Sequence, residues 1–360
     1  MNSTQNIFTS FCHYCERFEL LDMLNDALLL VDANTYMILY MNEKARQMYG
    51  YYTGEEIEKM HMREISCDMN TTVKRFDAAR KHRRDGWICS CWQRKKNGDM
   101  FKVQVSLKYI KIHGTDVLAA IVRDVTADMR LKEDIIQAGR IQQSFLQQDM
   151  DNDLFTMKTV FKPYHHISGD FYGYIWHEER SVLFGYLIDV MGHGVSAALQ
   201  AASSRALFDR IAYKDIPLNE KLLKLNNMTK PYFAEDSLAA VICFELDFKE
   251  HTITCASGGI NYFLALQKNE TRLQQAIINI PGMLLGVSPD VSADVSYEQK
   301  MIPFQSGDSF FFLSDGLLDL LRETREDRMF DFENLYGKLG QLAESKKLCD
   351  DASAMCFLIK

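Results

Sequence analysis

Short apolar runs separated by turn residues fill the first third of the chain, a pattern typical of strands joined by tight connections. Ala27–Asp32 is the first such run, and Tyr36–Asn42 is the second. Asn42 is also a candidate N-cap, because an asparagine side chain can accept a hydrogen bond from the first turn of a helix. Three more strands are expected at residues 86–94, 100–112 and 117–125, with Lys96-Asn97-Gly98-Asp99 as a hairpin turn. Two strands, helices and three strands predict an α+β domain over residues 16–127.

A single apolar stripe follows this domain. From Asp128 to Gln148 the chain has no proline and only one glycine, and apolar residues recur at a spacing of three or four. The stripe consists of Leu131, Ile135, Ala138, Ile141 and Phe145. It predicts a helical linker over residues 128–150, either a short coiled coil or a helix packed on a neighbouring domain. Because so short a helix is marginal alone, we expect it to have a partner, and a homodimer would supply one.

The last part of the chain, residues 151–360, contains apolar strands that end beside acidic residues. Val182–Tyr186 leads to Asp189, which stands before the loop Gly192-His193-Gly194 and a helix that begins at Val195. Acidic positions flank other apolar runs at Asp170, Asp315 and the pair Asp350-Asp351. Aspartate and glycine are common in turns, so one such position would carry little weight. Four such acidic positions in succession predict carboxylates that meet at one edge of a sheet, where they would suit a hard divalent cation.

These acidic positions belong to motifs that occur in a familiar order. The motifs are Gly-Asp-Phe-Tyr at 169–172, Asp-Val-Met-Gly-His-Gly at 189–194, Pro281-Gly282-x-x-Leu285-Gly286, Ser-Asp-Gly-Leu at 314–317 and Asp-Asp-x-Ser at 350–353. Residues 151–360 therefore resemble the PPM family of metal-dependent serine/threonine protein phosphatases, in particular the bacterial sporulation and stress-response branch that acts on regulators of sigma factors. The resemblance implies an α/β/β/α sandwich. Ser168, Gly173 and Gly259 depart from the branch, which often has glycine, aspartate and histidine there.

The chemistry implied is hydrolysis of a phosphoserine or phosphothreonine. This reaction needs an activated nucleophile and neutralisation of phosphoryl charge, and two divalent ions, Mn or Mg, can supply both. The metal ligands expected are Asp170, Asp189, the Val190 carbonyl, Asp315 and Asp350. Asp189 would bridge the two ions and, with Asp315, is the expected catalytic residue, while Asp351 is the alternative to Asp350. His193 is either a general acid or a polar residue at a turn.

The α+β domain over residues 16–127 resembles a PAS domain. The matching segments are Val31-Asp32-Ala33, Leu39-Tyr40-Met41-Asn42, Met48-Tyr49-Gly50-Tyr51, Arg94-Lys95-Lys96-Asn97-Gly98 and the closing Ile121-Val122-Arg123-Asp124-Val125-Thr126. The resemblance implies that this domain senses a small molecule, a cofactor or a protein, without indicating which. His61 and His82 are either haem ligands or ordinary surface residues. A domain that serves only dimerisation is the alternative.

Composition narrows the functional classes. A net charge of −8 over 360 residues, with no basic cluster, argues against nucleic acid as a main partner. No apolar run is long enough to span a membrane, and the N-terminus lacks the pattern of a signal peptide. A cytoplasmic protein with reduced thiols is therefore expected, despite nine cysteines. The spacing of Cys12 with Cys15 and of Cys89 with Cys91 allows a zinc or redox site, but it is not that of a known zinc ribbon or finger, and ordinary packing on one face of a strand is the favoured explanation for Cys89 and Cys91.

The sequence thus predicts a metal-dependent serine/threonine phosphatase under the control of a PAS-like sensor. By resemblance, its substrate is a phosphorylated anti-anti-sigma regulator of the STAS type. The alternative is a non-catalytic sensor or adaptor that retains the phosphatase shell. The intact aspartates at 170, 189, 315 and 350 argue against that alternative.

Overall fold

The computed structural model describes residues 20–82, 86–112, 114–233, 237–268, 273–286, 296–324 and 331–360. The chain divides into two compact units, Met1–Glu133 and Asp134–Lys360. Cys12 and Cys15, which were considered as metal ligands, lie outside the described residues. No helix within the described ranges is long and apolar enough to cross a membrane.

The first unit is built on a five-stranded antiparallel sheet with the strand order β2-β1-β5-β4-β3. The strands are β1 (Ala27–Asp32), β2 (Ile38–Met41), β3 (Trp87–Arg94), β4 (Met100–Ile112) and β5 (Thr115–Asp124). Between β2 and β3 come α3 (Glu43–Tyr49), α4 (Gly54–Ile57), the 3₁₀ helix η1 (Met62–Glu64) and α5 (Met69–Lys81). Helices and one sheet face share a core that includes Tyr49, Phe76 and Phe101. The predicted α+β layout is confirmed.

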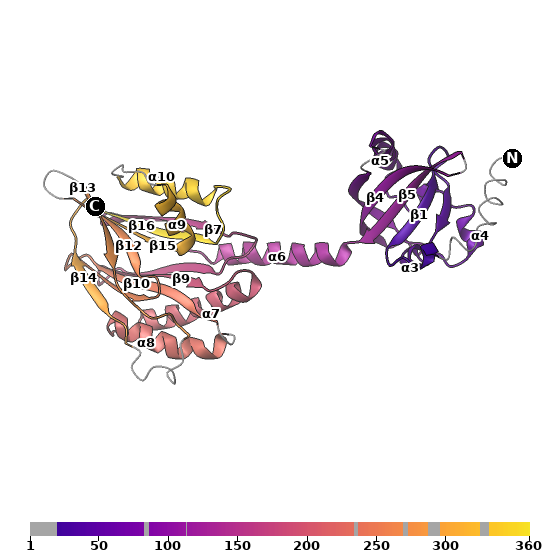
Figure 1. Ribbon diagram of the computed structural model, residues 1–360. Helices are drawn as coiled ribbons and strands as arrows, with labels where there is room; N and C mark the ends of the chain where they lie inside the picture. The colour runs from indigo at the N-terminus through magenta and orange to yellow at the C-terminus, as the bar shows by residue number, and fades with distance from the viewer. Residues whose placement is uncertain are drawn as a thin grey trace. The chain divides into compact units, whose positions relative to one another are not determined.

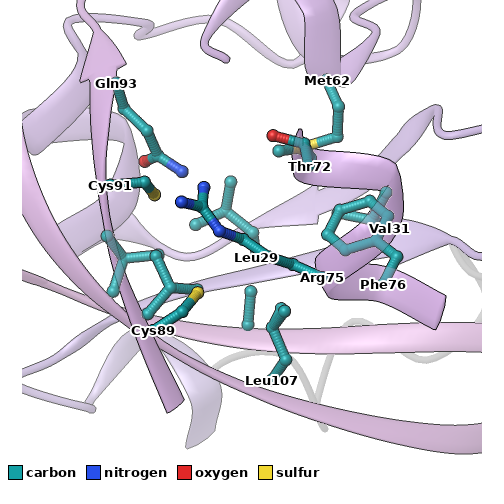
Figure 2. A pocket seen from close by; sticks show the side chains of 13 residues that line it. Leu29, Val31, Met62, Thr72, Arg75, Phe76, Cys89, Cys91, Gln93 and Leu107 are labelled. Carbon is teal, nitrogen blue, oxygen red and sulfur yellow. The ribbon is translucent and has the colours of Figure 1, made fainter. Parts of the chain in front are cut away.

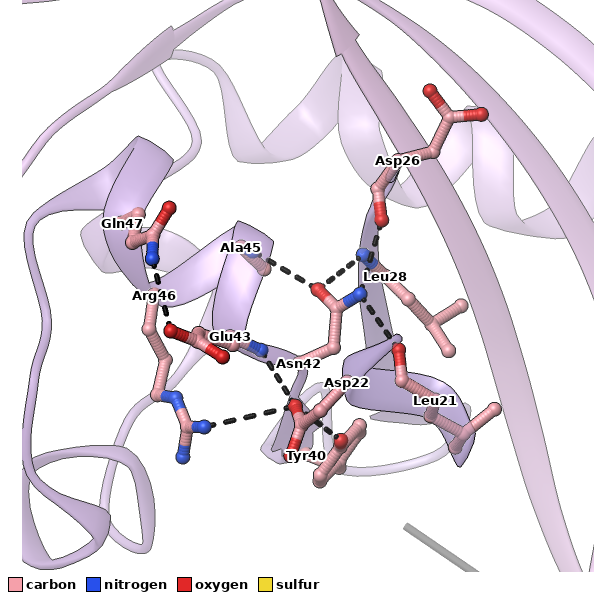
Figure 3. Close-up of polar contacts among 10 residues, drawn as sticks. All are labelled: Leu21, Asp22, Asp26, Leu28, Tyr40, Asn42, Glu43, Ala45, Arg46 and Gln47. Carbon is pink, nitrogen blue, oxygen red and sulfur yellow. Dashed lines mark hydrogen bonds and ion pairs between the residues drawn. The ribbon is translucent and has the colours of Figure 1, made fainter. Parts of the chain in front are cut away.

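Asn42 is the polar centre of this unit (Figure 3). Its side chain is fully buried, and its Oδ1 accepts hydrogen bonds from the backbone N–H groups of Ala45 and Leu28, at 2.9 and 2.8 Å. Its Nδ2 donates to the carbonyls of Leu21 and Asp26, both at 3.0 Å. The predicted N-cap of α3 therefore also joins that helix to β1 and to the chain before β1. One amide thus satisfies four backbone groups, two of which would otherwise be buried without partners.

The second strand begins later than its sequence predicts. The apolar run suggested a strand from Tyr36, but β2 starts at Ile38. The Asp32 side chain accepts hydrogen bonds from the N–H groups of Asn34 and Thr35, both at 2.8 Å. This turn leaves Tyr36 at a φ of 59°, which no strand residue adopts. The difference arises because an aspartate turn outweighs the strand preference of tyrosine.

The second unit is a four-layer sandwich (Figure 1). One antiparallel sheet has the order β14-β11-β10-β9-β8, and the other has the order β13-β12-β15-β16-β7-β6. The strands of the first sheet are β8 (Asp170–His177), β9 (Val182–Val190), β10 (Ala239–Asp247), β11 (Thr252–Gly258) and β14 (Gln299–Pro303). Those of the second are β6 (Met150–Asp151), β7 (Phe155–Lys162), β12 (Tyr262–Lys268), β13 (Leu273–Asn279), β15 (Ser309–Leu313) and β16 (Ala352–Ile359).

Aromatic side chains hold the two sheets together. Phe244 of β10 stacks on Phe312 of β15 with ring centroids 3.9 Å apart, and Phe357 of β16 packs edge-on against both rings. Helices α7 (Val195–Ala212) and α8 (Leu218–Thr229) cover the outer face of the first sheet, and the short 3₁₀ helix η2 (Lys230–Tyr232) follows them. Helices α9 (Asp315–Glu323) and α10 (Phe332–Ala343) cover the second sheet. The predicted α/β/β/α sandwich is confirmed.

Helix α6 (Thr126–Ser144) occupies the predicted linker. Its buried residues are Gly139 and Gln142, which are not on the apolar stripe. Leu131 is 62% exposed, and Ile141 and Phe145 are each 49% exposed. The helix therefore packs on the second unit through a small residue and a polar one, and most of the stripe is left at the surface.

The Asn42 contacts generate a stability prediction. Asn42→Ala removes four hydrogen bonds to backbone groups, two of them buried and two part-buried, and should lower the free energy of unfolding of the first unit by about 2–4 kcal/mol. Thermal and urea unfolding, followed by the fluorescence of Trp87 and Trp92, would measure the change. Gln47→Ala is the matched control, because Gln47 is on the same helix and bonds only to Glu43 in an exposed pair. Equal effects of the two substitutions would contradict a special role for Asn42.

Candidate functional site

Two of the predicted acidic residues lie opposite each other on neighbouring strands. Asp170 is the first residue of β8, and it pairs in register with Asp189, the penultimate residue of β9. Like charges that face each other across a ladder destabilise a sheet. Asp170 is also 1% exposed, which removes most of the water that would screen the repulsion. The sheet therefore holds two carboxylates at a place where neither is stable as an isolated anion.

The other predicted acidic residues reach the same edge from the second sheet. Asp315 begins α9 directly after β15, and Asp350 comes two residues before β16. The backbone at Gly316 lies very close to the backbone at Asp351. A Cβ at position 316 would stand 2.2 Å from the Asp351 carbonyl oxygen, so only glycine permits this close approach. The Ser353 hydroxyl donates a 2.6 Å hydrogen bond to Asp170 Oδ2 and thereby joins the two sheets.

The carboxylates raise one another's pKa. Burial is the largest cause of the raised pKa of Asp189. The charges of Asp170 and Asp315 raise this pKa further, as do hydrogen-bond contact with Asp315 and the charge of Asp350. The pKa of Asp170 is raised by burial, against the opposing hydrogen bonds from Ser353 and Ser314. Burial also raises the pKa of Asp315, with Asp350 contributing. The four side chains thus form one electrostatic cluster.

Within the described residues, no cation forms an ion pair with this cluster. The ion pairs found among the described residues include none of the four aspartates. In the same part of the chain, no three His, Cys, Asp or Glu side chains already converge on a common point. The carboxylates instead meet in pairs, because Asp170 lies opposite Asp189 in the sheet and the Asp189 side chain contacts that of Asp315. A divalent cation among them would favour the charged forms, so the donor set fits a metal centre with oxygen ligands.

Asp350 and Asp351 have different surroundings. Asp351 is 4% exposed, and its carboxylate accepts hydrogen bonds from the N–H groups of Tyr164 at 2.8 Å and Gly169 at 2.7 Å. Asp350 is exposed and accepts only from the N–H of Asp351, at 2.8 Å. The Asp351 carboxylate therefore fixes the loop that precedes Asp170, whereas the Asp350 carboxylate is open toward the cluster.

The loop after Asp189 is shaped by glycines. Gly192 and Gly194 have φ values of 89° and 85°, in the region that other residues rarely adopt. His193 between them is exposed, and its ring lies 5.5 Å from the ring of His165 in an edge-on contact. His165 comes from the loop that Asp351 holds. Two imidazoles therefore stand at the rim of the carboxylate cluster, one of which the sequence did not indicate.

The side chain of Tyr186 lies where a side chain at position 173 would stand. Position 173 is a glycine here, where the phosphatase branch often has aspartate. A Cβ on Gly173 would stand 2.4 Å from the Tyr186 hydroxyl oxygen. That hydroxyl donates a 2.9 Å hydrogen bond to Asp209 of α7. The departure from the family pattern is therefore accompanied by an aromatic ring that fills the vacated space, and it leaves the four clustered aspartates intact.

Two glutamines that sequence reasoning missed hold the strand that carries Asp170. Gln142 of α6 donates to the Ser168 carbonyl at 2.7 Å and accepts from the Ser168 N–H at 2.9 Å. Gln147 makes the same pair of bonds to Tyr174, at 2.8 and 2.6 Å. The Ser168 hydroxyl in turn accepts from the Asp170 N–H at 3.0 Å. The signal in the sequence was weak, because a glutamine on a helix is ordinarily solvated.

Comparisons with known proteins agree with this geometry. Residues 181–356 match the model of the family Stage II sporulation protein E (SpoIIE), and residues 25–127 match a PAS domain model. Phosphoserine phosphatase RsbP of Bacillus subtilis is 24% identical over 248 residues, which are 64% of this chain and 58% of that protein. The chain thus matches little more than half the length of that relative.

Solved structures show the fold of the second unit. The SiaA-PP2C domain of Pseudomonas aeruginosa is 16% identical, with a TM-score of 0.50, and the match covers 66% of this chain and all of that domain. A structure of RsbX in complex with magnesium is also 16% identical, with a TM-score of 0.45, over 59% of this chain and 99% of the other.

The raised pKa values generate a prediction for pH. A group whose pKa is higher in the folded than in the unfolded protein stabilises the fold at low pH, and that contribution is lost as pH rises through its folded value. With chelator present, stability should therefore fall from about pH 5 to about pH 8, by at most about 1.4 kcal/mol per pH unit for each carboxyl that stays protonated. Thermal unfolding across this range would measure the slope, and Asp189→Asn should flatten it. An unchanged slope in that variant would contradict the carboxylate cluster.

Proposed function

We propose that this chain is a metal-dependent protein serine/threonine phosphatase under PAS control. Residues 181–356 match the SpoIIE family model and residues 25–127 match a PAS domain model, which supports the proposal. The observation that carries the proposal is the cluster of Asp170, Asp189, Asp315 and Asp350. Four segments of two sheets bring these carboxylates together with no cation of the described chain as counter-charge. Such an arrangement lowers the stability of the fold, and a purely structural site would not retain it.

The cluster supports an assignment of metal ligands. Phosphatases of this family use divalent metal ions, and two such ions, Mn or Mg, would activate a water molecule and neutralise phosphoryl charge. Asp189 touches Asp315 and is influenced by Asp170 and Asp350, so it is the residue suited to bridge two ions. The Val190 carbonyl and the Asp315 and Asp350 carboxylates would complete one site, and Asp170 would serve the other. The solvated Asp350 suits this role better than Asp351, whose oxygens are already bonded.

Residues around the cluster would orient the substrate and move its protons. His193 is exposed on the glycine loop, so its imidazole can reach the oxygen of a leaving serine and donate a proton to it. His165 packs against His193 and limits the directions in which that ring can turn. Asp315 and Asp350 are exposed as well, which favours a phosphorylated side chain on a folded protein over a small molecule that requires enclosure.

The proposed substrate is a phosphoserine or phosphothreonine on a STAS-type anti-anti-sigma regulator. The name of the relative, phosphoserine phosphatase, supports the phosphoserine part of this proposal. The alternative function, a non-catalytic adaptor with a phosphatase shell, is disfavoured because such a protein would gain nothing from four mutually repelling carboxylates.

Helix α6 is the proposed connection between sensing and catalysis. The C-terminal half of the helix bonds through Gln142 to the residue that supports Asp170. Leu131 and Ile141 remain exposed on the same helix. A second copy of the chain that covers them would form the homodimer proposed from the sequence, and any shift of the helix would reach Asp170 through Gln142.

The metal requirement is directly testable. Phosphatase activity should need added Mn or Mg and should disappear with chelator. Asp189→Asn should lower kcat by at least about 100-fold and abolish the rise in melting temperature on metal addition, because it weakens both metal positions. Asp319→Asn, on the exposed side of α9 near Asp315, is the matched control and should retain activity. A folded Asp189→Asn protein with normal turnover would exclude the proposed mechanism.

The substrate proposal predicts an order of rates. Phosphorylated STAS-type proteins should be hydrolysed more efficiently, by kcat/KM, than p-nitrophenyl phosphate or phosphotyrosine peptides. Phosphate release from each, at equal enzyme and metal concentration, is the measurement. Asp189→Asn should abolish the release in every case, which distinguishes this activity from a contaminant. Preference for phosphotyrosine would refute the serine/threonine assignment.

The dimer proposal predicts the effect of charges on the exposed stripe. Leu131→Asp combined with Ile141→Asp would bury two carboxylates at the proposed interface and should produce monomers, because unpaired buried charges are costly. Lys132→Asp combined with Gln143→Asp places the same residue type at exposed positions next to them and should leave the mass unchanged. Light scattering would measure both. A dimer that survived the first pair of changes would show that the stripe is not the interface.

A further inference from the structure

The PAS domain contains a pair of cysteines that face a small cavity (Figure 2). Cys89 and Cys91 alternate along β3, so both side chains point to the core face of the sheet, where they pack against its apolar cluster. Apolar residues such as Leu29, Val31 and Phe76 form much of the wall. Packing was the favoured explanation for these cysteines, but it does not account for the polar groups around them.

A cation and a hydrogen bond act on the two thiols. Arg75 of α5 extends into the cavity beside both sulfurs, and its guanidinium donates a 3.3 Å hydrogen bond to the Ser90 carbonyl, between the two cysteines. Hydrogen-bond contact with Cys91 lowers the pKa of Cys89 to about 7, and the Arg75 charge contributes, against the opposing effect of burial. The same contact raises the pKa of Cys91. The Arg75 guanidinium and the contact between the thiols thus favour a thiolate on one cysteine and a proton on the other, an arrangement in which Cys89 would be the nucleophile and Cys91 the proton donor.

The size of the cavity limits what can reach the sulfurs. Its volume is about 20 Å³, and a site needs roughly 10–15 Å³ to hold one water molecule. Haem, flavin and other large cofactors do not fit this space, whereas hydrogen peroxide is close to water in size. Both cysteines are also only half-buried, so small solutes have access from the edge of the sheet.

From this geometry we propose that Cys89 and Cys91 are an oxidation site at which hydrogen peroxide forms a reversible intrachain disulfide. The Cys89 thiolate attacks one peroxide oxygen, the S–O bond forms as the O–O bond breaks, and the leaving hydroxide takes a proton to become water. The Cys91 thiol then loses its proton and attacks Cys89 Sγ, the S–S bond forms and a second water leaves. Two thiols lose two electrons in all, and one peroxide gains them.

The strand geometry explains why such a bond would be readily reversed. Residues two apart on an extended strand have Cα atoms about 6.6 Å apart, near the upper limit of about 6.8 Å for disulfides. Closing the bond would strain β3, and strained disulfides are more easily reduced. β3 is the edge strand of its sheet and pairs with β4. Its last residues also bond to residues 65 and 66, where the Arg94 N–H donates to the Ile65 carbonyl at 2.8 Å, so the part that carries the two cysteines is the part that can deform. Gln93, two residues further on, accepts the hydroxyl hydrogen of the buried Tyr49 and would carry the deformation to α3.

The experiment uses the reduced full-length protein at neutral pH with excess hydrogen peroxide. Trypsin cuts after Arg84 and Arg94, so one peptide, residues 85–94, contains both cysteines and no others. Its mass should fall by two hydrogens, and dithiothreitol should restore it. This change should proceed at least about tenfold faster than oxidation of the exposed Cys349. Equal rates, or oxidation without the loss of two hydrogens, would overturn the proposal.

Two substitutions separate the role of Cys91 from simple packing. Cys91→Ser keeps a donor beside Cys89 but cannot form the disulfide, so a sulfenic acid should accumulate at close to the normal rate and react with dimedone. Cys91→Ala removes the donor and should slow labelling of Cys89 about tenfold. Arg75→Gln should slow it as well, and circular dichroism would verify folding. Identical rates in the Ser and Ala variants would show that the contact between the thiols does not activate Cys89.

Discussion

The repulsion among four aspartates at the edge of the sandwich is the constraint on which the catalytic unit depends. Asp170 and Asp189 face each other in one sheet, and Asp315 and Asp350 approach from the other. Folding must hold these carboxylates together against their charges, and little water screens the buried Asp170 and the partly buried Asp189. The aromatic contacts between the sheets, above all Phe244 on Phe312, supply apolar stabilisation that opposes this cost.

Hydrogen bonds from neighbouring residues fix the position of Asp170 in this cluster. Ser353 links Asp170 to the second sheet, and Asp351 holds both ends of the loop that leads to Asp170. Gln142 of α6 bonds to the backbone of that same loop. The position of Asp170 is thus determined by residues of two sheets and one helix, so any change in α6 has a short path to the proposed metal site. Coupling of this kind needs an element with two arrangements, and the exposed stripe of α6 is where a second arrangement would begin.

The PAS domain is stabilised at its polar centre by satisfied hydrogen bonds rather than strained by repelling charges. Its polar centre, Asn42, is completely satisfied by four backbone groups, which makes that corner rigid. The edge strand β3 contrasts with it, because it carries two thiols and a neighbouring guanidinium around a space of water size. The Asn42 corner and β3 lie at opposite edges of the sheet, so the proposed oxidation at β3 would change one edge while the hydrogen bonds of Asn42 hold the other.

The sequence by itself determined the elements and the chemistry of this protein. The strands Ala27–Asp32, Met100–Ile112 and Ser309–Leu313 follow the apolar runs residue for residue, and the Asn42 cap was evident from residue type alone. Local patterns succeed here because strand and cap preferences act over a few neighbouring residues. The four aspartates remain predicted metal ligands, and the sequence indicated them because each one stands beside an apolar strand.

Only the tertiary structure decided which of these residues meet, because contacts between distant segments leave no periodic trace in the chain. It showed that Asp350 and Asp351 have different surroundings, because the Asp351 carboxylate accepts hydrogen bonds from two backbone N–H groups. It showed that Gln142 rather than the apolar stripe lies against the catalytic unit. It also placed Arg75, from a helix, beside two thiols of a strand. In each case the deciding factor is a hydrogen bond or a charge between residues far apart in sequence, and folding alone brings them within reach.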